Sequence, residues 1–192
     1  MNNNISFGAS LKTNTFIRKG RMHTPVSVSI VELDKTNAND MNALSTISDS
    51  WNKEGSKNCR FNNYVDMILT KAGSEENDFS VKDHYLALTT QKDNFEKLDP
   101  KNVLGVSLFS EDGVGGELEY LQVHPNTCKS YAGSKRVYKN VGTAMIDYLK
   151  DTYSKVHIFV NAAHDAVKFY YKNGFVPYNK SYSWYLHLPQ NK

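Results

Sequence analysis

The segment from Glu117 to Ala144 constrains the fold more than any other part of this 192-residue chain. Residues 117–123 predict a β-strand, and His124-Pro125 ends it because proline has no amide for a continuing ladder. After a polar loop, a helix is predicted to open over 139–144, with apolar residues at helical spacing behind it. The segment therefore predicts a strand, a loop and a helix start in succession.

The predicted helix start has a composition suited to binding an anion. It comprises Lys139, Asn140, Val141, Gly142, Thr143 and Ala144. Glycine and small side chains let a ligand approach the unbonded amides of a first helical turn, and the helix dipole favours negative charge there. The simplest ligand is a phosphate group. A plain turn with no ligand is the alternative, because a single glycine before a helix is common.

The chain downstream repeats the strand–helix order. A strand is predicted over 155–160, followed by Asn161 and a helix in which Tyr170 stands four residues before Gly174-Phe175. Together with Val-x-Pro after the first strand and the Q/R-x-x-G-x-G/A-like helix start, this order resembles the GCN5-related N-acetyltransferase (GNAT) superfamily. The resemblance covers residues 84–188 well, and the rest only in the order of its elements.

The resemblance implies an α/β (α+β) domain with the acyl-CoA N-acyltransferase fold. Its central sheet would be mixed and mostly antiparallel, flanked by helices, and splayed between the strands near Val123 and Val160. We expect one such domain over 24–192, preceded by a tail or an added strand over 1–23.

Periodicity places the other elements. Alternating side chains predict a first core strand over 24–32, and further strands are predicted over 85–88, 103–109, 176–178 and 182–188. Two amphipathic helices are predicted, one capped by Asp40 and one over 64–72 before Gly73. Residues 91–101 are predicted to form a long solvated turn.

Composition excludes several classes of protein. A net charge of +3 from 23 basic and 20 acidic residues gives no large field of one sign, so we expect no nucleic-acid or membrane partner. The two cysteines, Cys59 and Cys128, lack metal-type spacing, and no apolar run is long enough for a signal peptide or a membrane span. We expect a soluble cytoplasmic protein without metal, as a monomer or homodimer.

The resemblance also implies acetyl-CoA as cosubstrate. Its pyrophosphate would bind the amides over 140–144 beside Lys139, which replaces the usual Gln or Arg and to which Arg136 is an alternative. The pantetheine arm would run along the strand segment Leu121, Gln122 and Val123 through backbone hydrogen bonds. Asn161 would contact the cofactor or simply cap the next helix.

Two side chains are candidates for proton transfer. Tyr170 occupies the position of the family's general-acid tyrosine, although an aromatic core residue is the alternative. Glu117, predicted on the same strand face as Glu119, Leu121 and Val123, is the leading general base, with Glu119 or a water as the alternative. We expect His124 to be an exposed turn residue and assign it no role.

The loop over 126–138 is longer than the family pattern and carries basic and aromatic side chains: Lys129, Tyr131, Lys135, Arg136 and Tyr138. It either reaches the adenine and 3′-phosphate, shapes the acceptor entrance, or is a solvated surface loop.

We therefore expect an N-acetyltransferase that moves an acetyl group to a primary amine of a small molecule or a protein, by direct transfer in a ternary complex. A non-catalytic acyl-CoA-binding or regulatory module with the same fold is the alternative. Serine-hydrolase, dinucleotide-binding and P-loop motifs are all missing from the sequence.

Overall fold

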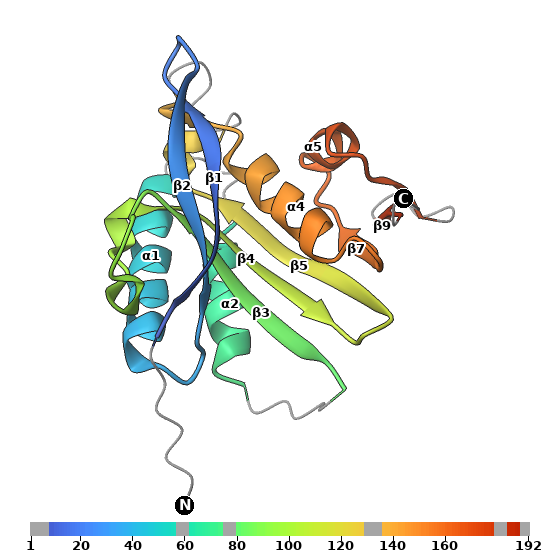
Figure 1. The fold of residues 1–192 in the computed structure, drawn as a ribbon, viewed down its shortest axis with the longest axis horizontal. Coiled ribbons are helices and arrows are strands. Elements are labelled where there is room, and N and C mark those ends of the chain that lie inside the picture. The colour runs from blue at the N-terminus through green and yellow to red at the C-terminus, as the bar shows by residue number, and fades with distance from the viewer. Residues whose placement is uncertain (1–7, 57–61, 75–79, 129–135, 179–183, 189–192) are drawn as a thin grey trace, which may run out of the picture.

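The computed structural model describes residues 8–56, 62–74, 80–128, 136–178 and 184–188. Within them the strands form one mixed sheet in the order β6-β1-β2-β3-β4-β5-β7-β9-β8 (Figure 1). The strands are β1 (Ser10–Lys19), β2 (Thr24–Leu33), β3 (Lys82–Thr89), β4 (Val103–Glu111), β5 (Gly115–Val123), β6 (Tyr138–Lys139), β7 (His157–Asn161), β8 (Val176–Pro177) and β9 (Trp184–His187).

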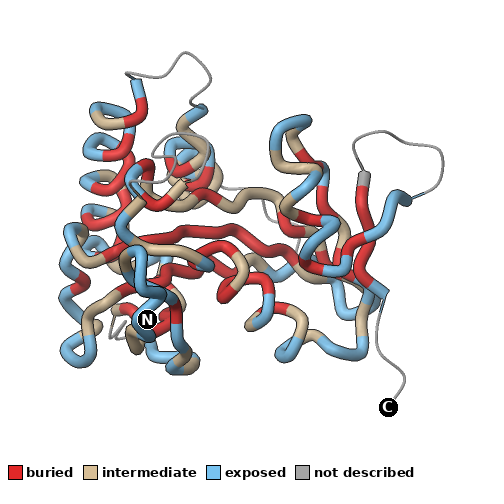
Figure 2. The backbone as a smooth tube through the Cα atoms, turned by 90° about the horizontal axis from the view of Figure 1, so that it is seen from above, coloured by how far each residue is buried: buried red, intermediate tan, exposed pale blue. Residues whose placement is uncertain are grey.

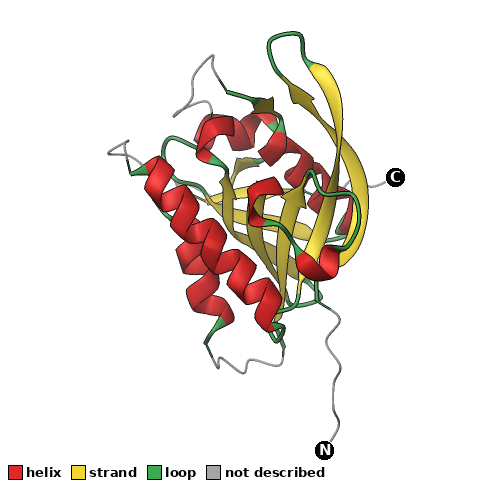
Figure 3. Cartoon of the chain, turned by 90° about the vertical axis from the view of Figure 1, so that its left-hand side faces the viewer, coloured by secondary structure: helices red, strands yellow, loops and turns green. Residues whose placement is uncertain are grey.

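Helices cover both faces of this sheet. α1 (Ala38–Gly55) and α2 (Tyr64–Ala72) lie side by side on one face, and α4 (Val141–Thr152) packs on the other (Figure 3). The short helix α5 (Val167–Lys172) follows β7, and three single 3₁₀ turns, η1 (Phe95–Lys97), η2 (Pro100–Asn102) and η3 (Pro125–Thr127), lie in connections. The α/β fold class predicted from the sequence is confirmed.

The alternating side chains of the strands supply two cores, one on each face. The α1–α2 face buries Val31, Leu44, Ile47, Trp51, Val65 and Ile68, among others. The α4 face buries Val28, Ile30, Leu86, Phe109, Leu118, Met145 and Tyr170, among others. The central strands are therefore buried along most of their length (Figure 2), as expected for a sheet sandwiched between helices.

The sheet opens between β5 and β7. These two strands pair in parallel only from Gly115–His157 to Leu118–Val160. On its other side β5 pairs with β4 as far as Val123, and a register shift leaves Glu119 as an extra residue, which forms a β-bulge. The predicted splay is thus present, and it begins directly after Leu118.

The N-terminal region contributes an added strand. β1 pairs with β2 along its whole length and with β6 at Arg18 and Lys19. Residues 10–19 therefore belong to the sheet. Residues 1–7 lie outside the described part of the chain.

Two helix boundaries differ from those predicted. α1 begins at Ala38 and is capped by Asn37, whose side chain accepts from the amides of Asn39 and Asp40. Asp40, the predicted cap, is buried in the first turn and accepts from the Asp34 amide at 2.8 Å instead. Residues 91–101 contain η1 and most of η2 in place of an irregular turn.

The second difference lies after β7. α5 begins only at Val167, so Asn161 is the last residue of β7 and caps no helix. The predicted last strand is described from Trp184 to His187, and Tyr182 lies outside the described residues.

Candidate active site

Beyond Leu118, β5 has a backbone edge that faces away from β4. The amide of His124 donates to the Leu104 carbonyl at 2.9 Å, so the backbone N–H and C=O groups of residues 122 and 124 face β4. Because backbone groups alternate in an antiparallel ladder, those of Leu121 and Val123 point the other way, where β7 no longer pairs. An extended ligand can hydrogen-bond to such an edge as an added strand does.

Because of the bulge, Glu117 and Glu119 lie on the opposite face of the sheet from the one predicted. Leu118, Leu121 and Val123 all pack on the α4 face of the sheet. Glu119 lies on the α2 face, where its carboxylate pairs with Lys71 of α2. Glu117 precedes Leu118 on the strand and therefore also lies on the α2 face, away from Leu121 and Val123.

Gln122 has a different environment from its two neighbours on β5. Its side chain is buried and points to the start of α2, where Oε1 accepts from the Val65 amide at 2.9 Å and Nε2 donates to the Asn62 carbonyl at 3.2 Å. The side chain of Gln122 is thus fully engaged within the protein, and its backbone faces β4.

The start of α4 presents amides without helical acceptors. Asn140 precedes the helix in a left-handed conformation, φ 66°, and its side chain forms no capping bond. The first helical bond runs from the Ala144 amide to the Asn140 carbonyl at 2.9 Å, so the amides of Val141, Gly142 and Thr143 have no acceptor within the helix. The amide of Ala144, predicted as a further donor, is occupied.

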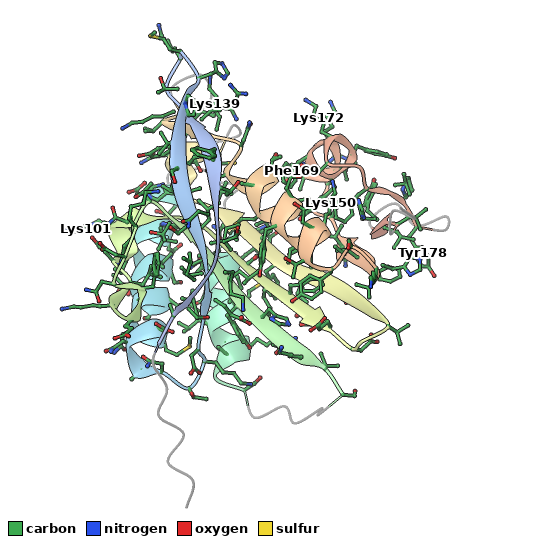
Figure 4. All side chains as sticks on the ribbon, viewed as in Figure 1. Lys101, Lys139, Lys150, Phe169, Lys172 and Tyr178 are labelled. Carbon is green, nitrogen blue, oxygen red and sulfur yellow. The ribbon has the colours of Figure 1, made fainter. Side chains whose placement is uncertain are left out.

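Gly142 joins this helix start to the open edge of β5. A Cβ atom at this position would lie 3.0 Å from the Phe169 ring of α5 and 3.6 Å from Cγ1 of Val123. Any side chain here would crowd both neighbours. The contacts also show that β5, α4 and α5 converge at one point, with Phe169 beside α4 (Figure 4).

Basic side chains lie on β1 and β6, and β6 immediately precedes the start of α4. Lys139 of β6 pairs with Arg18 of β1, and its Nζ lies 3.1 Å from Nε2 of His23 (Figure 4). Lys19 lies over the Tyr138 ring at 5.6 Å. The sequence alone did not place these residues of the β1–β2 hairpin beside Lys139, because only the pairing of β1 with β6 brings them together.

Tyr170 lies in the core next to this convergence. Only 6% of the residue is exposed, and its ring contacts Phe169 and Phe175 at centroid distances of 5.1 and 5.5 Å. Burial raises the pKa of Tyr170 above its ordinary value, and the nearby phenol of Tyr64 raises it further. The Tyr170 hydroxyl therefore keeps its proton at neutral pH.

The two candidate bases differ in their partners. Glu117 is half-buried and forms no hydrogen bond or ion pair with the described residues. Burial raises its pKa, Glu119 raises it further and Lys71 opposes the shift. Glu119 is held by Lys71 and by the Ser110 hydroxyl at 2.5 Å. Glu117 is therefore the carboxylate that is free to take a proton.

His124 is not the exposed turn residue predicted. Its half-buried ring packs edge-on against Trp51 at 5.4 Å, and Nδ1 accepts from the Asn126 amide at 3.1 Å, which caps η3. Burial lowers its pKa, opposed by Glu54. These contacts give His124 a structural role at the end of β5.

Other predicted residues lie at the margin of the site. Asn161 is exposed at the end of β7. In the long loop, the Val137 amide donates to the Asn126 carbonyl at 3.2 Å, and Arg136 is half-buried. Lys129, Tyr131 and Lys135 lie outside the described residues, as does Cys59.

The segments that the structure describes hold neither a cluster of metal-ligating side chains nor a membrane-spanning helix. No group of three or more His, Cys, Asp and Glu side chains is placed to hold a metal ion in these segments. Among the helices that the structure describes, none has the length and apolar character needed to cross a bilayer.

Comparison with known proteins found similarity only to solved structures. No protein-family profile and no curated protein matches the chain. Tetrahymena GCN5 is 14% identical, with 81% of this chain and 91% of that chain covered and a TM-score of 0.48. The PaiA N-acetyltransferase from Thermoplasma acidophilum in complex with coenzyme A is 13% identical, with 84% and 97% covered and a TM-score of 0.47.

A mutant of the AtaT toxin, bound to the C-terminus of the antitoxin AtaR and to acetyl-CoA, is 15% identical, with 83% of this chain and 92% of that chain covered and a TM-score of 0.49. The mixed sheet, the parallel β5–β7 pair that parts after Leu118 and the helices on both faces are those expected from the sequence resemblance. The arrangement of strands and helices is that of the acyl-CoA N-acyltransferase fold, which the sequence resemblance implies.

Proposed function

We propose that the protein is an acetyl-CoA-dependent N-acetyltransferase that moves the acetyl group directly to a primary amine within a ternary complex. One observation carries the proposal: Gly142, in the first turn of α4, lies against Val123 on the open edge of β5. A site for an anion and a site for an extended chain are therefore adjacent and continuous.

The residues present fit the two chemical parts of coenzyme A. The amides of Val141, Gly142 and Thr143 and the cation of Lys139 suit a diphosphate, which needs hydrogen-bond donors and positive charge. The backbone of Leu121 and Val123 offers sheet-type bonds to the amides of a pantetheine arm. Acetyl-CoA would supply the acetyl group as a thioester and would leave as a thiol.

Glu117 would remove the proton from the acceptor. An alkylammonium group has an ordinary pKa of about 10.4, so at neutral pH a base must take its proton before the nitrogen can attack. A carboxylate with a raised pKa is a stronger base than an exposed one, and Glu117 is not held by another side chain in the described structure. It would act directly or through a water.

Tyr170 would return a proton to the leaving sulfur. With an ordinary pKa of about 10 the phenol is already protonated at neutral pH. Burial raises the pKa further and makes Tyr170 a weaker acid, so donation would depend on its hydroxyl lying next to the sulfur. Its neighbour Phe169 contacts Gly142, which keeps α5 beside the proposed cofactor site. Proton removal and proton return would thus be divided between β5 and α5.

Tyr170→Phe tests the proposal. With a panel of amines and peptides, we expect wild-type protein to release coenzyme A thiol, and the variant to lose about 10²–10⁴-fold in kcat because general acid catalysis contributes that much. Its affinity for acetyl-CoA should stay within about twofold, because the phenol forms no cofactor bond in this account.

Tyr171→Phe is the matched control, since Tyr171 is the exposed neighbour on the same helix. It should leave both kcat and affinity unchanged. Cofactor binding with no thiol release from any acceptor by wild-type protein would contradict the enzyme proposal and favour a binding or regulatory module.

A further inference from the structure

We propose that Gln122 is a positioning residue that couples the cofactor edge of β5 to the acceptor side of the site. Its side chain would hold the start of α2, and with it Tyr64, in the place that the bound cofactor requires. This inference rests on the proposed function, because it assigns a means by which one substrate prepares the site for the other.

The start of α2 has no cap of its own. Asn63 occupies the N-cap position, but its side chain forms no capping bond and instead donates to the Ser48 hydroxyl of α1 at 2.8 Å. The cap comes from another element: Gln122 of β5 accepts from the Val65 amide at 2.9 Å. A strand residue thus performs what a local Ser, Asp or Asn usually does.

The bond pair is strong because it is buried and complete. Gln122 is only 7% exposed, and both ends of its amide are used, one by Val65 and the other by the Asn62 carbonyl at 3.2 Å. A buried amide that loses its partners is left with unsatisfied groups, so the two bonds resist displacement. Together they fix residues 62–65 to one residue of β5.

Tyr64 lies within this fixed segment. Its ring lies 6.0 Å from that of Tyr120 on β5, and it is close enough to Tyr170 to raise the pKa of that phenol. Tyr64 is the first residue of α2, and Glu117 lies on the same face of the sheet as this helix. A shift of the α2 start would change the surroundings of the reacting groups without touching the cofactor.

The other side of the coupling is the backbone of β5. Gln122 lies between Leu121 and Val123, whose backbone groups face the edge where the cofactor would bind. A ligand paired to both would restrain Gln122 between them, and the restraint would pass through its side chain to Val65. By reciprocity, a restrained α2 start would also favour the cofactor-bound edge.

Hydrogen exchange of the Val65 amide in the full chain measures the coupling, with coenzyme A itself as the probe. In wild-type protein, saturating coenzyme A should slow this exchange several-fold. Gln122→Met has similar volume but no hydrogen bond, so we expect exchange without ligand to rise about tenfold and the ligand-dependent slowing to disappear. Gln122→Glu keeps an acceptor for Val65 and should restore part of both.

Ser48→Ala is the matched control, because it loosens the same connection from the α1 side without touching β5. It should keep the slowing by coenzyme A. The inference is overturned if Gln122→Met retains the slowing, or if wild-type protein binds coenzyme A with no change at Val65. If coenzyme A does not bind at all, the proposed function fails, whereas the exchange rates without ligand still test whether Gln122 caps α2.

Discussion

Two regions of the sheet differ in whether their buried charged side chains have partners. Across β2, β3 and β4, the buried His84 lies between two carboxylates, with Nδ1 2.7 Å from Glu32 and Nε2 3.1 Å from Glu111. Lys12 of β1 lies 2.7 Å from Glu32 and completes a network of four charged side chains. On β5, near the junction with β7, Glu117 has no such partner among the described residues.

The pKa values follow this difference. The hydrogen bond from His84 lowers the pKa of Glu32 to about 2, with help from Lys12 and against the effect of burial. Burial raises the pKa of Glu117. The network therefore stabilises the charges it contains. By contrast, the half-buried Glu117 and the first amides of α4 have no such partners among the described residues. We therefore expect stability and the proposed function to depend on different strands.

Placing a charge at the junction should have the largest effect. Gly142→Glu puts a carboxylate where the diphosphate would bind, and juxtaposed like charges cost several kcal/mol, so coenzyme A affinity should fall by at least about 100-fold in calorimetric titration. Gly142→Ala carries the crowding against Phe169 without the charge and should lose about tenfold or less. Equal affinities for the glutamate variant and wild type would remove the anion site.

Breaking the network should reduce stability but not cofactor binding. His84→Gln removes the charged partner of Glu32 and Glu111, and we expect the free energy of unfolding to fall by about 1–3 kcal/mol in urea titration. Coenzyme A affinity should stay within about twofold of wild type. A loss of affinity as large as that of Gly142→Glu would show that the two regions are not separate.

The network also sets the pH dependence of stability. Burial alone would lower the pKa of His84, but its bonds to Glu32 and Glu111 outweigh this and raise it above 6.5. The stabilisation from His84 is thus complete below pH 6.5 and is lost as the pH rises through the raised value. That from Glu32 is present above pH 4.5 and is lost toward pH 2. His84→Gln should flatten the stability profile at both limbs.

The smallest effect on stability is expected at the two glutamates of β5. Glu117→Gln resembles the protonated form that burial favours, so at neutral pH the unfolding free energy should stay the same or rise by less than about 1 kcal/mol. Glu119→Gln breaks the pair with Lys71 and should lower it by up to about 1 kcal/mol.

Glu117→Gln and Glu119→Gln should also differ in catalytic activity. Only Glu117→Gln should lose turnover, and the acid limb of the wild-type pH–rate profile should lie above the ordinary glutamate pKa of 4.5. Loss of that limb in Glu119→Gln instead would make Glu119 the base.

Most of the fold could be predicted because hydrophobic periodicity and helix starts are local. The strand ending at Val123, the helix after Asn140 and the helix over 64–72 follow from spacing alone. Boundaries were less certain where several capping residues stand together, as at Asn37, Asn39 and Asp40.

The site geometry depended on features without a local pattern. The bulge at Glu119 adds one residue to β5 and so moves Glu117 to the opposite face from Leu121, which alternation cannot foresee. The bond from Gln122 to Val65 and the pairing of β1 with Lys139 join segments far apart in the chain. Such contacts are set by packing, and one sequence gives no sign of them.

The central claim is that the first turn of α4 and the open edge of β5 hold one ligand together. Titration of coenzyme A into isotope-labelled protein, followed through backbone amide chemical shifts, tests it most directly. We predict saturable shifts at Gly142 and Thr143 together with Leu121 and Val123, all with a single dissociation constant. Saturable binding that leaves these four amides unmoved, or no binding at all, would contradict the account.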